Sequence, residues 1–508
     1  MYPLNSIGLT APVSSIKVIY ASKTMVSDAN LSPGSNVFGT DQTEKFDAIL
    51  SQASATQGII VYVDVAFSAR YIRPRSNTFI FCLDNCGFIQ RSFSNCQFIA
   101  NHTRSKSNYG NIINGVELGN RNITIQGGII NGNGWGNGAF NQDKYSTEVA
   151  ADGQKVGGYN FLIAFAGVYN VLIKDCFLYN ARTYFGFHTR CHSVTYQNVK
   201  YYVQDSAPYG NLDGLDFVGN CQNIKIIDCS AKCKDDCFAF AGQYGWQSND
   251  INAVSYDAGN SSTSSWYKYA STGPVVDCEV RNFFFEDSYM GFRIMSSDGF
   301  VSRILISGLF GKIKQNLIGI IDNYLSRESG NVDYNPLWTP SGNNEGNVGL
   351  LTMENFQVEV PTPGSPVIYF GLKADEIVFK DWTHNGFTAD NMILFGKYTN
   401  IRNLSFSGLK RRSTLGNNEA LIVFNGGAKV QDLFLGNVNF DKTGAPANDS
   451  NIVRIDSGTI DNIQMSNITT RNTGAAINNV GGAVGGIQHN NFKGVMASAG
   501  AIGGTVAS

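Results

Sequence analysis

The stretch NLDGLDF, residues 211–217, superposes on a second stretch, KDDCFAF, residues 234–240, when the chain is shifted by 23 residues. The shift places Asp213 on Asp236 and two apolar residues on two phenylalanines. Both stretches alternate apolar and polar residues, so each is expected to form a short strand whose alternate side chains share a face. If such strands stack as successive coils, about 4.8 Å apart, Asp213 and Asp236 lie one above the other.

Two further stretches, FGFH at 185–188 and MGFRI at 290–294, fit the same frame. They place His188 and Arg293 with Asp216 in one column that is expected to point outward. The apolar residues between them are expected to point into the core: Leu215, Phe217, Phe238, Phe240, Phe292 and Ile294. A group of carboxylates, an arginine and a histidine on one face is hard to explain by folding alone. We therefore expect the chemistry of the protein around residues 183–295.

A short phrase recurs along the chain, in which usually Asn or Ser precedes an apolar-polar-apolar alternation. Copies begin at Asn122, Asn170, Ser193, Asn223, Ser302, Glu376, Asn403 and Asn462. Many neighbouring copies are spaced in the twenties, which indicates a parallel β-solenoid with three short strands per turn. Asn tolerates left-handed backbone and suits a repeated corner. An antiparallel sandwich is the alternative, but it does not predict the 23-residue superposition.

The chain is expected to have three parts. Residues 1–40 carry scattered Ser, Asn, Pro and Gly and are interpreted as a loosely structured lead-in or attachment segment. Residues 41–480 are expected to form the β-solenoid, and the Gly/Ala-rich residues 481–508 a C-terminal segment. Near the start of the solenoid, residues 40–50 predict an amphipathic helix that covers the open end of the first coil with Phe46, Ile49 and Leu50.

Two insertions, near 132–159 and 243–272, interrupt the repeat and carry aromatic residues, among them Trp246 and Tyr256. These residues could stack on sugars or pack on their own loops.

Composition limits the function. The net charge of −2 gives no reason to expect a nucleic-acid partner. No run of 18 apolar residues is present, so no membrane insertion is expected. The N-terminus lacks a basic region followed by an apolar run, so no secretory signal is predicted. Cys229, Cys233 and Cys237 are spaced by four, but no histidine follows at ligand spacing. Buried reduced thiols are therefore expected, with no metal and no cofactor.

Several motifs resemble, in their order, the signatures of the polygalacturonase-like glycoside hydrolases of family 28, which read N-T-D, D-D-C and R-I-K. Here they are NLDG at 211–214, DDC at 235–237 and RIM at 293–295, and GIINGNGW at 128–135 is similar to that family's early G-x-I-x-G-N-G. The helix near residue 45 followed by a strand at 59–63 resembles the start of the β-helix in phage tailspikes. The resemblance covers roughly residues 40–330.

The resemblance implies an all-β, right-handed, single-stranded parallel β-helix (a pectin-lyase-like solenoid) with a short N-terminal capping helix. It also implies inverting hydrolysis, with Asp235 as the general acid and with Asp213 and Asp236 holding and deprotonating the attacking water. Arg293 matches the family's substrate-binding arginine. An inverting enzyme needs an acid and a base far enough apart to admit water. Three carboxylates this close cannot all ionise normally, so one is expected to stay protonated near neutral pH.

The sequence departs from the family pattern at two places. The family's G-H-G is absent, and the corresponding region reads YDAG at 256–259. The lysine of R-I-K is Met295, which argues against a plain pectin substrate. His188 is a candidate source of an imidazole, with a structural role as the alternative. The other candidate substrate-binding residues are Asp216, Asn211, Tyr256 and Trp246.

The leading hypothesis is an endo-acting glycoside hydrolase that cleaves a capsule or O-antigen type of surface polysaccharide, as a phage tailspike or depolymerase does. It implies a polysaccharide partner, a place in the virion tail with attachment through the N-terminus, and, by analogy, a homotrimer. The alternatives are a secreted pectin-type hydrolase, a polysaccharide lyase, which the stacked acids disfavour, and a non-catalytic adhesin or fibre. The three aspartates could also simply satisfy turn amides.

Overall fold

The computed structural model describes residues 13–32, 37–92, 94, 97–102, 120–134, 136, 161–205, 212–242, 274–296, 300–321, 347–360, 366–386, 391–396, 399–413, 420–442, 451–471, 476–493, 497–498 and 506–507. The chain divides into two compact units. The first comprises Met1–Phe238, Gln243–Val275 and Asn335–Thr339, and the second comprises Ala239–Gly242, Val276–Tyr334 and Pro340–Ser508.

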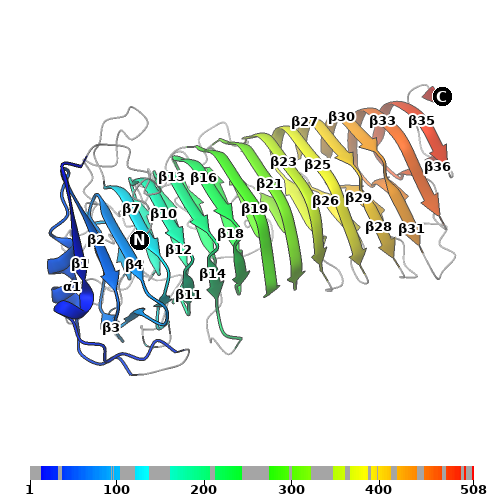
Figure 1. Ribbon diagram of the computed structural model, residues 1–508. Helices are drawn as coiled ribbons and strands as arrows, with labels where there is room; N and C mark the ends of the chain where they lie inside the picture. The colour runs from blue at the N-terminus through cyan, green and yellow to red at the C-terminus, as the bar shows by residue number, and fades with distance from the viewer. Residues whose placement is uncertain are drawn as a thin grey trace, which may run out of the picture. The chain divides into compact units, whose positions relative to one another are not determined.

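The first unit contains short parallel strands in two sheets, and Figure 1 shows several of them side by side. One sheet holds β1 (Ser15–Tyr20), β2 (Gln57–Val63), β3 (Ala66–Ala69), β4 (Thr78–Cys82), β5 (Gly87–Gln90), β7 (Arg121–Gln126), β8 (Ile129–Asn131), β10 (Tyr169–Lys174), β11 (Phe177–Tyr179), β13 (His192–Gln197), β14 (Lys200–Tyr202), β16 (Cys221–Ile227) and β17 (Ser230–Lys232). The other holds β6 (Ile99–Ala100), β9 (Ile163–Ala166), β12 (Gly186–Thr189) and β15 (Leu215–Val218).

The second unit repeats this arrangement. One sheet holds β21 (Val301–Ile313), β23 (Asn347–Glu359), β25 (Lys373–Gly386), β27 (Asn400–Ser407), β28 (Lys410–Ser413), β30 (Ala428–Gly436), β31 (Asn439–Lys442), β33 (Gly458–Arg471), β35 (Ala483–Lys493) and β37 (Val506–Ala507). The other holds β20 (Phe292–Ser296), β22 (Ile318–Ile321), β24 (Ile368–Gly371), β26 (Asn391–Phe395), β29 (Ala420–Phe424), β32 (Asn451–Ile455), β34 (Ile477–Asn479) and β36 (Ala497–Ser498). Two strands, β18 (Phe238–Gly242) and β19 (Val275–Ser288), begin in the first unit and continue in the second.

The strand register confirms the predicted solenoid. Tyr169 of β10 pairs in parallel with His192 of β13, 23 residues later, and His192 pairs with Gln222 of β16, 30 residues later. A parallel pairing at this interval requires one full coil between partners. The fold is therefore a right-handed parallel β-helix, and the antiparallel sandwich is excluded.

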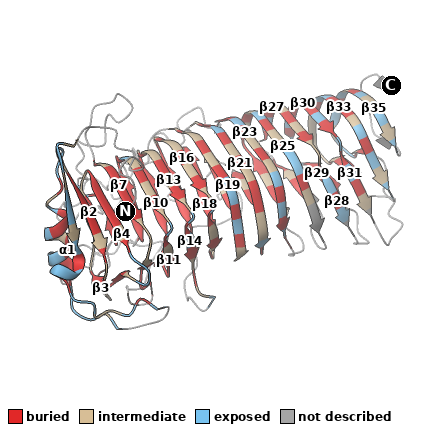
Figure 2. Cartoon of the chain, viewed as in Figure 1, coloured by how far each residue is buried: buried red, intermediate tan, exposed pale blue. Residues whose placement is uncertain are grey.

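Inward-pointing side chains form the core of each unit, and Figure 2 shows buried positions along every coil. Val171, Val194 and Ile224 are in register on β10, β13 and β16, and each is at most 1% exposed. Burying one such side chain stabilises the fold by about 1.5–3 kcal/mol. The six residues predicted to point inward are all buried: Leu215, Phe217, Phe238, Phe240, Phe292 and Ile294.

Asparagine and serine form the predicted corners in the first unit. Asn122, Asn170, Ser193 and Asn223 all have positive φ, between 54° and 59°. Their side chains bond along the stack, as from Asn170 Nδ2 to Asn122 Oδ1 at 2.9 Å. In the second unit Asn403 and Asn462 are not left-handed; that backbone occurs instead at other positions, including Asn437, Asn467 and Asn491.

The Asn170 corner is expected to contribute measurably to stability. Asn170→Ala loses the bond to Asn122 and strains the backbone at φ 59°, so we expect a loss of about 2 kcal/mol. Asn170→Gly keeps an unstrained backbone and should lose about half as much. Urea unfolding of both variants checks this. Equal losses would contradict the contribution of the left-handed backbone.

The helix α1 (Thr43–Leu50) covers the first coil, as predicted. Phe46, Ile49 and Leu50 are each at most 3% exposed. The ring of Phe46 lies 4.9 Å from that of Phe67 and 6.2 Å from that of Phe88, which belong to the core of the first two coils. The helix therefore shields an apolar end that water would otherwise reach.

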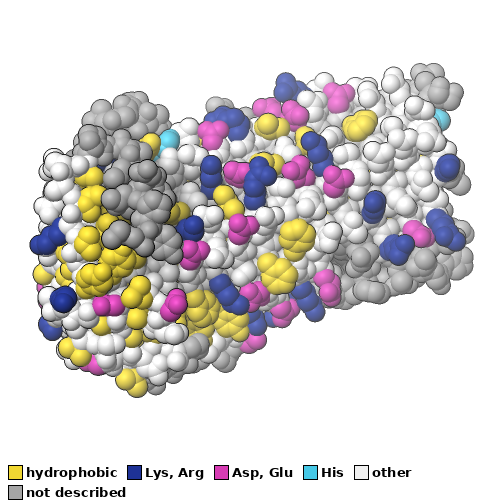
Figure 3. Space-filling view, in the orientation of Figure 1, with side chains coloured by type: hydrophobic (Ala, Val, Ile, Leu, Met, Phe, Trp, Pro, Cys, Tyr) yellow, Lys and Arg dark blue, Asp and Glu magenta, His cyan; other side chains and the backbone are white. Residues whose placement is uncertain are grey.

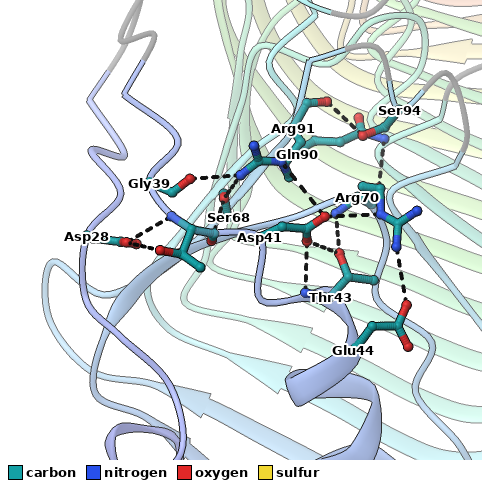
Figure 4. A network of polar contacts seen from close by, with 11 residues as sticks. Asp28, Gly39, Asp41, Thr43, Glu44, Ser68, Arg70, Gln90, Arg91 and Ser94 are labelled. Carbon is teal, nitrogen blue, oxygen red and sulfur yellow. Dashed lines mark hydrogen bonds and ion pairs between the residues drawn. The ribbon is translucent and has the colours of Figure 1, made fainter. Parts of the chain in front are cut away.

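A polar network attaches the start of α1 to the first coils (Figure 4). Asp41 accepts hydrogen bonds from the Thr43 N–H (3.0 Å) and the Thr43 hydroxyl (2.5 Å). Arg70 pairs with Asp41 (3.1 Å) and with Glu44 (3.2 Å). The network supplies the acceptor that the first helical N–H groups need, because the N-cap, Gln42, makes no side-chain capping bond.

Two predicted boundaries are wrong. Within 1–40, residues Ser15–Tyr20 form β1, which pairs in parallel with β2, so this part of the lead-in belongs to the solenoid. At the C-terminus, β35 pairs with β33 from Thr459↔Ala483 to Thr469↔Lys493, so the coils continue past residue 480. Most of the two predicted insertions, including residues 137–160 and 243–273, lies outside the described residues.

Apolar side chains gather on the visible face of the first coils (Figure 3). Tyr20, Tyr62 and Phe81 are in register on β1, β2 and β4, and their rings lie 5.2 and 5.8 Å apart in sequence. The predicted burial of the cysteines holds for eight of the nine that the structure describes. None of the described helices is long and apolar enough to cross a membrane.

Candidate active site

The candidate active site lies at one corner of the first unit, where the chain passes from one sheet to the other. Asp213 lies between β14 and β15, and Asp235 and Asp236 lie between β17 and β18. Both segments are two to six residues from a strand end, which fixes their backbone within the stack of coils. The same corner one coil earlier contains residues 180–185, between β11 and β12.

Backbone hydrogen bonds hold two of the aspartates in equivalent positions. The Gly214 N–H donates to the Asp236 carbonyl oxygen (2.7 Å), and the Leu215 N–H donates to that of Cys237 (3.1 Å). In a parallel ladder these bonds place Asp213 opposite Asp236. The predicted 23-residue superposition is therefore confirmed for this pair.

Gly214 allows the two coils to approach closely. A Cβ at this position would lie 1.8 Å from the Cys237 carbonyl oxygen and 2.5 Å from Cε2 of Tyr201. The Tyr201 hydroxyl also donates to the Cys237 oxygen (2.9 Å). Only glycine leaves room for this contact, which lies directly beside Asp213.

Gly214→Ala is expected to destabilise the protein by about 1–3 kcal/mol, because the clash is with backbone that cannot rotate away. Chemical denaturation measures the effect. Gly58→Ala is the matched control, since its Cβ would meet nothing closer than 3.6 Å. A loss at Gly214 no larger than that at Gly58 would contradict the close approach.

The three carboxylates differ in exposure. Asp213 is 6% exposed and Asp236 is 4% exposed, whereas Asp235 is half-buried. Asp235 is thus the one that a large substrate reaches most directly.

A buried thiol reports how the carboxylates cluster. Burial raises the pKa of Cys233 well above 9, and its hydrogen bond with Cys237 and the charges of Cys237, Asp213 and Asp235 raise it further. Asp213 and Asp235 therefore act on the same buried group. The negative potential at this corner favours the neutral thiol and, for the same reason, a proton on one of the carboxylates.

Aromatic side chains continue the aspartate column in the preceding coils. The Phe185 N–H donates to the Asp213 oxygen and the Leu162 N–H to that of Tyr184, so Tyr184 takes the position of Asp213 one coil earlier. The Tyr184 ring lies 5.2 Å from that of Phe161, which stacks on Phe187 at 4.5 Å. Tyr184 is half-buried and offers a ring edge beside the carboxylates.

Arg182 occupies the same corner and was not among the predicted residues. It is only 1% exposed. The early glycine motif packs against it, because a Cβ on Gly134 would lie 3.1 Å from the Arg182 Cα. The Gly134 N–H also donates to the carbonyl oxygen of Asn180 (2.9 Å). A buried guanidinium here brings a permanent positive charge to the corner that holds the aspartates.

The predicted position of His188 is wrong. His188 pairs with Phe217 and Phe165, while Asp216 pairs with Phe187, so the true offset is one residue longer than expected. Because a one-residue slip moves a side chain to the opposite face, His188 points into the core. Its exposure is 0%, and its Nε2 forms a hydrogen bond with the Tyr196 hydroxyl (2.7 Å). Burial lowers the pKa of His188 from 6.5 to about 3, so the ring is neutral.

The other candidate residues have different outcomes. Asp216 lies on the outer side of β15, between inward-pointing neighbours, but is only 5% exposed. Arg293 lies in the second unit on β20, half-buried, with Nη2 3.5 Å from Sδ of Met290. Asn211, Trp246 and Tyr256 lie outside the described residues. Within the described segments, no group of three His, Cys, Asp or Glu side chains is placed to hold a metal ion.

The fold and the carboxylate corner define a parallel β-helix with an acidic site on its coils. Residues 90–332 match the family model described as glycosyl hydrolases family 28. The match includes all three aspartates and confirms the predicted resemblance to that family. It supports a polysaccharide-cleaving glycoside hydrolase. No curated protein matches the sequence.

Solved structures of similar fold include enzymes, tailspikes and an adhesin. A family 28 exopolygalacturonase from Yersinia enterocolitica is 11% identical, with a TM-score of 0.49 over 90% of this chain and 76% of that one. A double mutant of the tailspike protein of E. coli bacteriophage HK620 is 10% identical, with a TM-score of 0.48 over 94% and 78%. A surface adhesin of Streptococcus pneumoniae is 12% identical, with a TM-score of 0.42 over 92% and 93%.

Proposed function

We propose that this protein is an endo-acting glycoside hydrolase that cleaves a surface polysaccharide of capsule or O-antigen type by an inverting mechanism, in the manner of a phage tailspike or depolymerase. The observation that carries the proposal is the hydrogen bond between Gly214 and Asp236, which sets Asp213 and Asp236 in successive coils with Asp235 beside them. The residues involved lie within the region that matches the hydrolase family.

In this mechanism Asp235 is the general acid. It is the most accessible of the three carboxyl groups, and its proton passes to the glycosidic oxygen as the bond to the anomeric carbon breaks. Asp213 and Asp236 hold a water molecule and accept its proton as its oxygen attacks the anomeric carbon from the opposite face. The negative charge of Asp213 and Asp236 favours the protonated form of Asp235 before reaction.

Two nearby groups suit a substrate that carries negative charge. Arg182 brings a permanent cation to the corner, and the half-buried Tyr184 provides an aromatic edge for a sugar ring. Arg293, on β20, is retained from the sequence prediction as a substrate-binding residue. With Met295 in place of the family lysine, we propose an acidic polysaccharide other than pectin.

The proposal extends to the setting of the protein. A tailspike acts outside the cell from the virion tail, is attached through its N-terminal part, and is expected to be a homotrimer. These points rest on the resemblance alone, and a secreted pectin-type hydrolase remains the second setting to test.

The test is oligosaccharide release from purified capsular polysaccharides, O-antigens and pectins. We expect reducing ends without the ultraviolet absorbance of unsaturated uronates, a rapid fall in polymer length, and inversion at the new anomeric centre by NMR. Absorbance would instead identify a lyase, and release from pectin alone would identify the pectin-type enzyme. Binding without release from any polymer would favour an adhesin.

A further inference from the structure

A cavity of about 400 Å³ lies in the second unit beside β25, β28 and β31, away from the residues of the candidate active site in sequence. Its volume is within the range of about 300–1,000 Å³ that small-molecule sites occupy. The cavity is lined by Thr383, Lys410, Arg411, Arg412, Asn439 and Asp441. Three of these side chains are cations and one is a carboxylate, so the lining has a net formal charge of +2.

Two of the cations face outward together. Lys410 and Arg412 are two residues apart on β28, so their side chains share a face, and both are exposed. They pair in register with Asn439 and Asp441 of β31. Among the described residues, neither Lys410 nor Arg412 forms an ion pair, so both charges are available to an anionic ligand.

The third cation lies beneath them. Arg411 points inward and is 1% exposed, with its guanidinium carbon 5.9 Å from the centre of the Phe440 ring. Because the core around it screens charge weakly, Arg411 strengthens the positive potential of the cavity above.

The carboxylate in the lining has a different requirement. Oδ1 of Asp441 is buried, and among the residues that the structure describes it has no hydrogen-bond partner. A buried carboxylate oxygen can only accept, so the group that completes it must be a donor. A hydroxyl meets this requirement, whereas a simple anion such as phosphate or sulfate at neutral pH mainly offers acceptors.

We propose that this cavity binds an acidic saccharide. A sugar carboxylate pairs with Lys410 and Arg412, and a hydroxyl of the same or the next sugar donates to Asp441. The combination of unpaired cations and an unsatisfied acceptor selects a ligand that is both anionic and rich in hydroxyl groups. That the saccharide belongs to a polysaccharide substrate rests on the proposed function.

The first experiment measures the reactivity of Lys410 in the full chain. Lysines are acetylated with a limiting reagent and quantified by mass spectrometry, with and without a galacturonate trisaccharide or a glucuronate-containing hyaluronan tetrasaccharide. We expect at least one of these to slow the modification of Lys410 several-fold and to leave the exposed Lys429 of β30 unchanged. A neutral galactose trisaccharide should have no effect.

The second experiment compares affinities in a chain carrying Asp235→Asn to prevent hydrolysis. Lys410→Gln with Arg412→Gln should weaken or remove one class of saccharide site by at least about tenfold, the scale of one charge-assisted hydrogen bond. Lys429→Gln with Lys493→Gln removes two exposed charges elsewhere in the second unit and should change nothing. Asp441→Ala should also weaken the site.

Protection of Lys410 by inorganic phosphate but by neither acidic saccharide would overturn the proposal, as would unchanged affinity in the Lys410 and Arg412 variant. These outcomes are separate from failure of the proposed function, which would appear as native protein that releases no reducing ends while Lys410 is still protected.

Discussion

Replacing Asp235 with asparagine is expected to reduce the release of reducing ends by roughly 10²–10⁴-fold, the contribution typical of a general acid. Asparagine has nearly the same shape as aspartate but cannot donate a proton from a carboxyl group. Because Asp235 is half-buried at a corner, the substitution should leave the unfolding midpoint nearly unchanged. Initial rates on the polysaccharide identified by the panel give the measurement.

The matched control is Asp228→Asn, which removes an exposed carboxylate from the same unit. Its backbone is left-handed, with φ 54°, and asparagine tolerates this conformation. Activity should therefore remain. An equal loss in the Asp228 variant would show that the overall charge of the unit, and not the acid, controls the rate.

Leaving-group chemistry separates the acid from the base. A nitrophenyl glycoside of the substrate needs little proton donation, so Asp235→Asn should recover most of its loss on this substrate. Asp213→Asn and Asp236→Asn affect attack by water and should remain impaired on both substrates. If Asp235→Asn stayed impaired to the same extent on the activated glycoside, its role as the acid would be excluded.

The sequence predicts the coil architecture because its signals are local and repeated. The corner asparagines, such as Asn122 and Asn170, combine a left-handed backbone with a side-chain ladder, and both properties follow from residue type. The pairing of Asp213 with Asp236 was also predictable, because their coils differ by a simple 23-residue shift.

Register fails where a loop of unknown length intervenes. Between His188 and Asp216 the chain passes through residues 206–211, so sequence alone does not determine the shift between coils. An error of one residue turned a core histidine into a surface candidate, because strand side chains alternate between faces. Neighbouring aromatic residues at Phe165 and Phe217 were the available signal, since they mark an apolar column.

Arg182 and Gly214 depend on packing that no motif encodes. Arg182 is buried because coils above and below cover it, and its sequence context resembles an ordinary turn. Gly214 is required by the position of Cys237 in the next coil. The boundary near residue 480 was missed for a related reason: backbone pairing continues through the Gly-rich β35 without help from large side chains.

The buried histidine leads to the second large effect, a loss of stability on acidification. The pKa of His188 is about 3 in the folded protein, against 6.5 when unfolded, because burial disfavours the charged ring. Between these values the unfolded chain binds a proton that the folded chain does not, so stability falls as pH decreases from about 6.5 toward 3. Linkage gives a loss of about 3 kcal/mol between pH 7.5 and pH 4 from this residue.

His188→Phe should remove that part of the pH dependence. Phenylalanine fits between Phe165 and Phe217 and does not titrate, although it leaves the Tyr196 hydroxyl without its bond and lowers stability at every pH. The measured quantity is the difference in unfolding free energy between pH 7.5 and pH 4, from urea titrations. Titrating carboxylates contribute equally to both proteins and cancel in the comparison. His192→Phe, at a half-buried histidine in the same unit, should retain the native dependence on His188. If native protein and His188→Phe lost the same stability on acidification, His188 would have to be charged or accessible in the folded state, contrary to its place in the core.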